Sequence, residues 1–212
     1  MAETTTETTP DAIGYGFAEI VALIAMQQGD AATASAEALR VGEYLDQQTV
    51  LFAGASSLVA RGLATVDDDG ALSVSGPTAA VAAVLTGAHR RMEITLLTPQ
   101  QTDSVIGVES DDFRLLFQPR TYLTWWAMAQ RPDISAAEAS LFVVEEHIRA
   151  NPVGGAMIRR REDESGETLY IKREGGSWTI GLSTAAQEDV TERAGLDDSA
   201  LLAEIRRIRQ DA

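Results

Sequence analysis

The stretch RMEITLL, residues 91–97, decides the fold class that this sequence predicts. Its apolar residues Met92, Ile94 and Leu96 alternate with polar ones, and Pro99 ends the run. An alternation of period two is typical of a β-strand that buries one face. The sequence therefore predicts a change from helical to extended structure where this stretch begins.

Two more strand-like runs follow at short intervals. One begins at Val105, and the next alternates from Phe113 to Phe117. Because strands joined by short connections pair antiparallel, the region 91–130 predicts a three-strand meander. The last part of this region, residues 121–130, is compatible with either a fourth strand or a short helix.

The C-terminal part, residues 135–212, follows a similar order. Ser135 and Glu138 have the spacing of a capping box at the start of a helix. After this helix, three further strands are expected at 156–161, 168–173 and 178–182. Thr184 to Gln187 repeats the capping pattern, which predicts helices at the end of the chain.

The N-terminal part, residues 13–90, is mainly helical by the same criteria. Apolar residues recur at helical spacing in four segments, which are 13–26, 31–45, 48–63 and 77–89. Between the last two segments, the turn sequence Asp67 to Gly70 indicates a short hairpin or an extended loop.

Together these segments predict an α+β fold with helices packed around two antiparallel three-strand meanders. The sequence leaves open whether the meanders join into one quasi-two-fold sheet. Residues 1–12, which are rich in Thr and Glu, are expected to form a disordered tail. Residues 13–212 are expected to form a single domain.

The charge and composition of the chain exclude several function classes. Its 212 residues include 17 basic and 32 acidic side chains, which give a net charge of −15. A phosphate backbone is repelled by this charge, so we expect no nucleic-acid partner. The absence of cysteine excludes disulfides and thiolate chemistry. The longest strongly apolar stretch, residues 20–26, is too short to span a bilayer, and we expect a cytoplasmic protein without membrane insertion.

Residues suited to catalysis or metal binding are scarce and scattered. His89 and His147 lie 58 positions apart, and neither has a ligand at metal-binding spacing. We interpret His147 as a structural residue. Glu145 and Glu146 are adjacent on a helix and diverge by about 100°, so they do not form a catalytic pair without partners elsewhere. The sequence predicts no catalytic residue, no metal site and no cofactor.

The aromatic residues Tyr122, Trp125 and Trp126 form the one cluster that we interpret functionally. Two of the three tryptophans of the chain lie here, and amphipathic aromatic side chains are favoured anchors in protein interfaces. The alternative is that these side chains fill the core beneath the sheet. We take the three residues as candidate partner-binding residues.

One function hypothesis is a winged-helix regulator. A helix that contains the segment 58–63 is followed by a possible hairpin up to Gly76, in the order that such a domain requires. From residue 31 to residue 65 the basic residues are only Arg40 and Arg61. A recognition helix in this segment would therefore neutralise little phosphate charge.

The second hypothesis starts from a family resemblance. It is carried by LVARGL at 58–63, the helix to His89 with the strand MEITLL at 92–97, the capped helix from Ser135, and GGSWTI at 175–180. In this order the segments resemble the EspG family, which comprises cytosolic chaperones of actinobacterial type VII secretion. The resemblance extends from about Ile13 to Arg209 and includes no residue-specific binding motif.

The resemblance implies a quasi-two-fold α/β body that holds an aggregation-prone helical secretion substrate without nucleotide or metal. The favoured hypothesis is therefore a non-enzymatic cytosolic protein-binding adaptor or chaperone whose partner is a small helical secreted protein. An enzyme whose site is assembled from scattered residues is the third hypothesis. The sequence predicts neither the identity of the partner nor the oligomeric state.

Overall fold

The computed structural model describes residues 12–162, 166–184 and 190–211 as a mixture of helices and strands. The helices are α1 (Phe17–Ala25), α2 (Asp30–Ala38), α3 (Gln48–Ala60), α4 (Gly76–Gly87), α5 (Ala136–Ala150) and α6 (Asp198–Arg209), with 3-10 turns η1 (Gly42–Tyr44) and η2 (Thr121–Leu123). The main sheet contains β1 (Ile13–Gly16), β4 (Arg90–Leu97), β5 (Thr102–Glu109), β6 (Arg114–Arg120), β7 (Thr124–Ala129), β8 (Gly155–Arg160), β9 (Thr168–Glu174), β10 (Ser177–Ser183) and β11 (Thr191–Leu196). A separate hairpin consists of β2 (Ala64–Val66) and β3 (Leu72–Val74).

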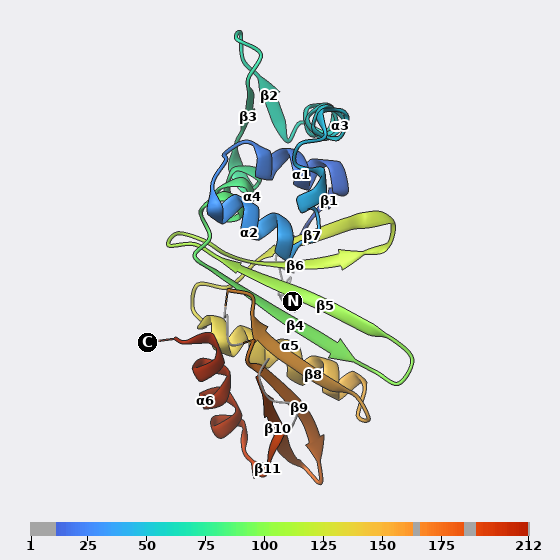
Figure 1. The fold of residues 1–212 in the computed structure, drawn as a ribbon, viewed down its shortest axis with the longest axis vertical. Helices are drawn as coiled ribbons and strands as arrows, with labels where there is room; N and C mark the ends of the chain where they lie inside the picture. Colours follow the sequence, from blue (N-terminus) through green and yellow to red (C-terminus); the bar gives the residue numbers. More distant parts are fainter. Residues whose placement is uncertain (1–11, 163–165, 185–189, 212) are drawn as a thin grey trace, which may run out of the picture.

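The main sheet is one continuous antiparallel sheet, in which the described strands follow the order β1-β7-β6-β5-β4-β8-β9-β10-β11 (Figure 1). The predicted α+β class is confirmed. The prediction of two three-strand meanders is wrong, because each run contains a fourth strand and the two runs join where β4 pairs with β8. Strand β1 extends the sheet by pairing with β7.

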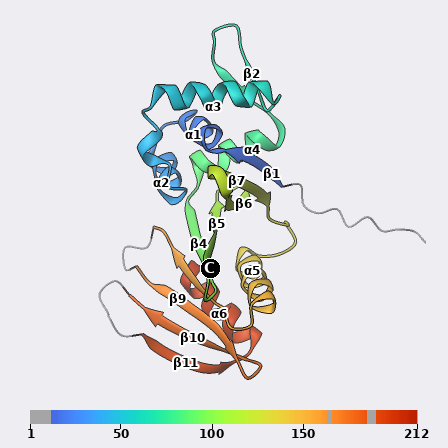
Figure 2. The same cartoon turned by 90° about the vertical axis from the view of Figure 1, so that its right-hand side faces the viewer.

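Strand β4 joins the two halves of the sheet and separates two hydrophobic cores. Ile94 lies opposite Val105 of β5 and Ile158 of β8, and all three pack in the core that α5 and α6 cover. The neighbouring Ile106 and Val108 pack in the core of α1, α2 and α4. Since successive residues of a strand point to opposite faces, the helices of the two halves cover opposite faces of the sheet (Figure 2).

The polar side of β4 is buried against the N-terminal helices. Arg91 donates hydrogen bonds to the hydroxyl of Ser35 on α2 over 3.0 Å and to the carbonyl oxygens of Ala31 and Ala88. It also forms an ion pair of 2.7 Å with Glu162. Arg91 therefore ties α2 and the end of α4 to the centre of the sheet.

Glu93 makes the corresponding connection toward β8. Its carboxylate accepts a hydrogen bond from Arg159 over 2.7 Å and one from Arg161 over 3.2 Å, and it lies 3.6 Å from the guanidinium of Arg40. A buried carboxylate requires such partners, because an unpaired buried charge is strongly destabilising.

The predicted helix 13–26 begins four residues late. Ile13–Gly16 forms β1, and Glu19 accepts a hydrogen bond from the amide of Gly16 over 2.7 Å. This bond satisfies a free amide at the helix start, so α1 begins at Phe17. Ile13 also fits the helical spacing of the apolar residues from which the helix was predicted. The strand was therefore missed.

Other differences from the predicted elements have local causes. Residues 121–130 resolve into the turn η2 and strand β7. Strand β11 was missed because Leu196 is its one buried residue and no apolar alternation marks it. The predicted helix start at 184–187 and the tail at 1–12 lie largely outside the described residues. No described helix is both long and apolar enough to cross a membrane.

The crossing of α1 and α3 depends on Gly54. A Cβ atom at this position would lie 1.8 Å from the carbonyl oxygen of Ala18. We therefore expect Gly54→Ala to push α3 away from α1 and to lower the free energy of unfolding by about 1–3 kcal/mol, the usual effect of overpacking. Gly87→Ala is the matched control, because a Cβ there meets open space, and it should leave stability unchanged or raise it by up to about 1 kcal/mol. Urea unfolding of both variants tests this, and equal effects would contradict it.

The ion pairs of Glu93 predict a pH dependence of stability. Burial raises the pKa of this carboxyl, but hydrogen bonds and charges from Arg159 and Arg161 outweigh burial and lower the pKa below its ordinary value of 4.5. When the pKa of a carboxyl is lower in the folded than in the unfolded protein, the ionised carboxylate stabilises the fold at every pH above the unfolded-state pKa. This stabilisation is lost as the pH falls through the folded-state pKa. We therefore expect the free energy of unfolding to fall in acid below about pH 4.5.

Urea unfolding between neutral and acidic pH measures this contribution. Glu93→Gln should be less stable at neutral pH and should show a shallower loss of stability in acid than the unchanged protein. Asp112→Asn, which alters an exposed carboxylate, serves as the control. An unchanged acid slope in Glu93→Gln would show that other groups govern the acid response.

Candidate partner-binding site

The structure separates the three aromatic residues predicted to bind a partner. Trp125 faces the N-terminal core and is 8% exposed, whereas its neighbour Trp126 faces the other side of the sheet and is 42% exposed. Tyr122 lies on the turn between β6 and β7 and is 97% exposed. The core alternative is therefore correct for Trp125, and Tyr122 and Trp126 remain as exposed candidates.

An apolar cavity of about 220 Å³ opens beside this turn. The rings of Phe17 and Tyr44 meet edge to face on its helical side, with centroids 4.5 Å apart. Leu123 belongs to the turn and also lines the cavity. The complete lining is Phe17, Ala38, Leu39, Arg40, Val41, Tyr44, Ser104, Ile106, Pro119, Leu123 and Trp125.

Unusual backbone conformations gather around this cavity. Arg40, Tyr122 and Leu123 have positive φ angles of 59°, 60° and 54°. The left-handed region costs an ordinary residue about 1–2 kcal/mol. In the described residues, the one other non-glycine residue with positive φ is Gln210, which ends α6. Strained residues often mark binding sites, and here they mark the cavity rim.

The conformation of the turn is imposed by the two strands that it joins. Arg120 and Thr124 form the last pair of the β6–β7 ladder, so three residues must reverse the chain. The hydroxyl of Thr124 donates a hydrogen bond of 2.9 Å to the carbonyl oxygen of Thr121. The turn thus leaves the side chain of Tyr122 exposed to solvent.

The size and lining of the cavity suit one kind of ligand. Small-molecule sites usually occupy about 300–1,000 Å³, so this cavity is small for a cofactor. An apolar side chain of a partner protein would meet aromatic and aliphatic walls, with the exposed side chains of Tyr122 and Leu123 beside the entrance. Small desolvated pockets of this type bind the anchor residues of protein interfaces.

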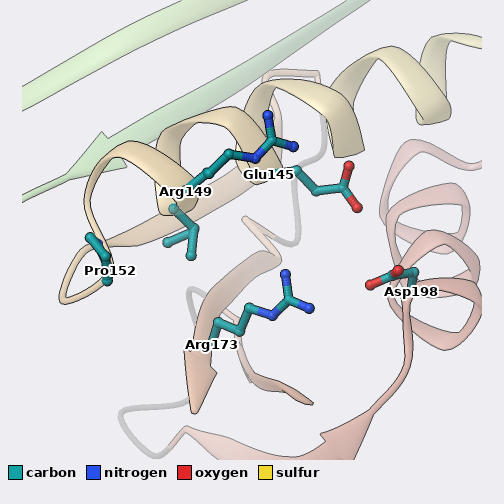
Figure 3. Close-up of a pocket in the computed structure, with 6 residues that line it drawn as sticks. Glu145, Arg149, Pro152, Arg173 and Asp198 are labelled. Carbon is teal, nitrogen blue, oxygen red and sulfur yellow. The ribbon is translucent and has the colours of Figure 1, made fainter. Parts of the chain in front are cut away.

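A second cavity, of about 440 Å³, lies between α5, the end of β9 and the start of α6 (Figure 3). Glu145 and Asp198 face each other across it, and Arg173 lies between their elements. Burial and the charge of Asp198 raise the pKa of Glu145. The sequence offered no signal for this proximity, because Asp198 lies on a different helix.

Trp178 positions two of the charged groups of this second cavity. Its indole nitrogen donates a hydrogen bond of 2.7 Å to Asp198, and the guanidinium of Arg173 lies 4.8 Å from its ring centroid. Arg149, the fourth charged residue of the lining, forms an ion pair with Glu146. The lining contains no Ser, Thr, Tyr or His side chain, so no hydroxyl or imidazole group accompanies the two carboxylates among the lining residues.

Comparisons with known proteins add no assignment to this geometry. No known protein family matches the chain, and no curated protein matches its sequence. Within the described residues, no group of three or more His, Cys, Asp or Glu side chains could hold a metal ion. The interpretation of the site therefore depends on the cavity, its strained rim and the exposed aromatic residues.

The strain at Tyr122 predicts an uncommon effect of mutation. Tyr122→Gly removes a ring that has almost no packing and places glycine where φ is positive. We expect the free energy of unfolding to stay unchanged or to rise by up to about 1 kcal/mol. Phe113→Gly, at a residue that is 40% exposed and has no positive φ, should instead lower stability, because a partly buried ring is lost and glycine loses more conformational freedom on folding. Thermal unfolding distinguishes the two, and strong destabilisation by Tyr122→Gly would show that the ring has a structural role.

Proposed function

We propose that the protein is a non-enzymatic adaptor or chaperone that acts in the cytoplasm and holds a helical segment of a partner protein, as the resemblance to the EspG family implies. The observation that carries this proposal is the apolar cavity with a strained rim, at which Tyr122 and Leu123 are exposed. Residues held in sparsely populated backbone regions cluster at ligand clamps and binding sites, which supports a binding role for this turn.

In this proposal an apolar side chain of the partner enters the cavity. Tyr122 and Leu123 then lose their contact with water and cover the entrance, in the way that residues around an anchor exclude solvent. Arg40 lies 3.6 Å from Glu93 with its side chain largely exposed. Because Arg159 and Arg161 also bind this carboxylate, Arg40 leaves positive charge at the rim. A partner helix with an apolar anchor and a nearby acidic residue fits this arrangement.

The winged-helix alternative receives support from the order of elements and none from their charges. The order of the elements matches that of such a domain, with α1, α2 and α3 followed by the β2–β3 hairpin. However, α3 has no charged side chain, and the hairpin turn contains Asp67, Asp68 and Asp69. A recognition helix and wing with these charges would repel phosphate.

Site-specific photocrosslinking in the native host tests the proposed binding site. A photoreactive benzoylphenylalanine replaces Tyr122, and we expect one discrete crosslinked product whose partner, identified by mass spectrometry, is a small helical protein. The position of Val153, which is 82% exposed and belongs to the other half of the molecule, serves as the control and should give no such product.

Leu123→Gly adds a second criterion to this experiment. It removes an apolar side chain from the rim at a residue with positive φ, so the fold should persist while the crosslinked product at position 122 decreases. Equal products at positions 122 and 153, or no product at 122, would contradict the proposed site.

A further inference from the structure

Helix α3 has an exposed face that carries no charge. Its 13 residues include no charged side chain, whereas 23% of the whole chain is charged. One side packs on α1 through Gly54 and Leu58. On the other side Phe52 is 66% exposed and Val59 is also exposed. These two residues are seven positions apart, so they lie on one face of the helix two turns apart, with the exposed side chain of Ser56 between them.

Acidic residues lie before and after this uncharged face. Glu43 and Asp46 precede α3, and the acidic segment 67–69 forms the turn of the β2–β3 hairpin that follows it. All five of these carboxylates are exposed. The basic residue after the helix, Arg61, is paired with the buried carboxylate of Glu19 over 2.6 Å and so does not offset them.

The hairpin stands beside α3 and extends away from the rest of the molecule (Figures 1 and 2). Asp67 fixes its turn by accepting hydrogen bonds from the amides of Asp69 and Ala71. Val66 of β2 is exposed as well. Helix and hairpin therefore present exposed apolar side chains together with an acidic turn that projects away from the body of the molecule.

We propose that α3 and the β2–β3 hairpin dock an amphipathic helix of a partner, whose apolar stripe is flanked at both ends by Lys or Arg. This inference rests on the proposed role in protein binding but concerns a surface separate from the cavity at Tyr122. Apolar contact with Phe52 and Val59 supplies the anchor, and the flanking carboxylates select basic partners and their orientation.

A second copy of the chain fits this surface poorly. In an antiparallel pair of α3 helices, Glu43 and Asp46 of one copy would approach the acidic hairpin turn of the other. In a parallel pair the two hairpin turns would approach each other. Both arrangements bring like charges together, and the net charge of −15 adds to the repulsion.

A synthetic helical peptide tests the proposal with the full-length protein. The labelled probe has about 20 residues, long enough for an extended helix, with Leu and Ala along one stripe and Lys at both ends. Its companion peptide carries Glu in place of every Lys. Fluorescence anisotropy at about 0.15 M salt should show binding of the basic peptide and at least tenfold weaker binding of the acidic one.

Two exposed phenylalanines provide a matched pair of protein variants. Phe52→Glu places a charge on this face of α3 and should weaken binding of the basic peptide at least tenfold. Phe142→Glu makes the same change on α5, where Phe142 is 58% exposed, and should leave binding unchanged. Replacing Asp67, Asp68 and Asp69 by Asn should weaken binding and reduce its dependence on salt.

Several results would overturn the proposal. They are the absence of binding by the basic peptide, equal binding of both peptides, and equal losses in Phe52→Glu and Phe142→Glu. Sedimentation that shows a dimer abolished by Phe52→Glu would assign the surface to a second copy instead. Tyr122→Gly should leave peptide binding unchanged, so failure of this surface and failure of the cavity site are separate outcomes.

Discussion

The pairing of β4 with both β5 and β8 is the constraint on which the rest of the structure depends. The apolar side chains of β4 belong to the core of α5 and α6. On its other side Arg91 binds α2 and Glu162, and Glu93 binds Arg159 of β8. The first half of the chain thus attaches to the second at one strand, through backbone ladders and through ion pairs that each have one buried member. Because breaking a buried pair leaves an unpaired charge, this junction resists separation of the halves and holds the helices on opposite faces of the sheet.

The elements with strong periodicity were predictable from the sequence, and those held by distant contacts were not. The alternation in RMEITLL and the capping box at Ser135 predicted β4 and α5, because each pattern reflects the local environment of its own residues. Strand β1 forms because β7 offers a free edge, and β11 because β10 does. Edge strands with few buried residues leave little hydrophobic signal, so β1 and β11 were missed. The pairing of β4 with β8 joins strands far apart in the sequence, so local patterns left the joining of the runs open.

The candidate site was predictable only in part, for a different reason. Aromatic composition pointed to Tyr122 beside the cavity and to Trp125 in its wall, whereas Trp126 faces the other side of the sheet. The cavity itself combines α1, η1, β5 and the β6–β7 turn, which are distant in the sequence. The positive φ of Tyr122 also had no signal, since glycine or asparagine usually marks such positions. Trp125 could be separated from Trp126 by strand alternation once residues 121–130 were known to form β7.

Helix α3 shows how charge limits what the order of elements implies. Helix, helix, helix and hairpin is an arrangement that can present a recognition helix to DNA, and the order here fits it. Helix α3 itself carries no positive charge, exposes Phe52 and Val59, and is preceded and followed in the chain by exposed carboxylates. Phosphate binding depends on basic side chains, and anchoring of a protein partner depends on apolar side chains that become buried. The side chains of α3 and the hairpin therefore favour a basic amphipathic partner, although the order of elements alone would favour nucleic acid.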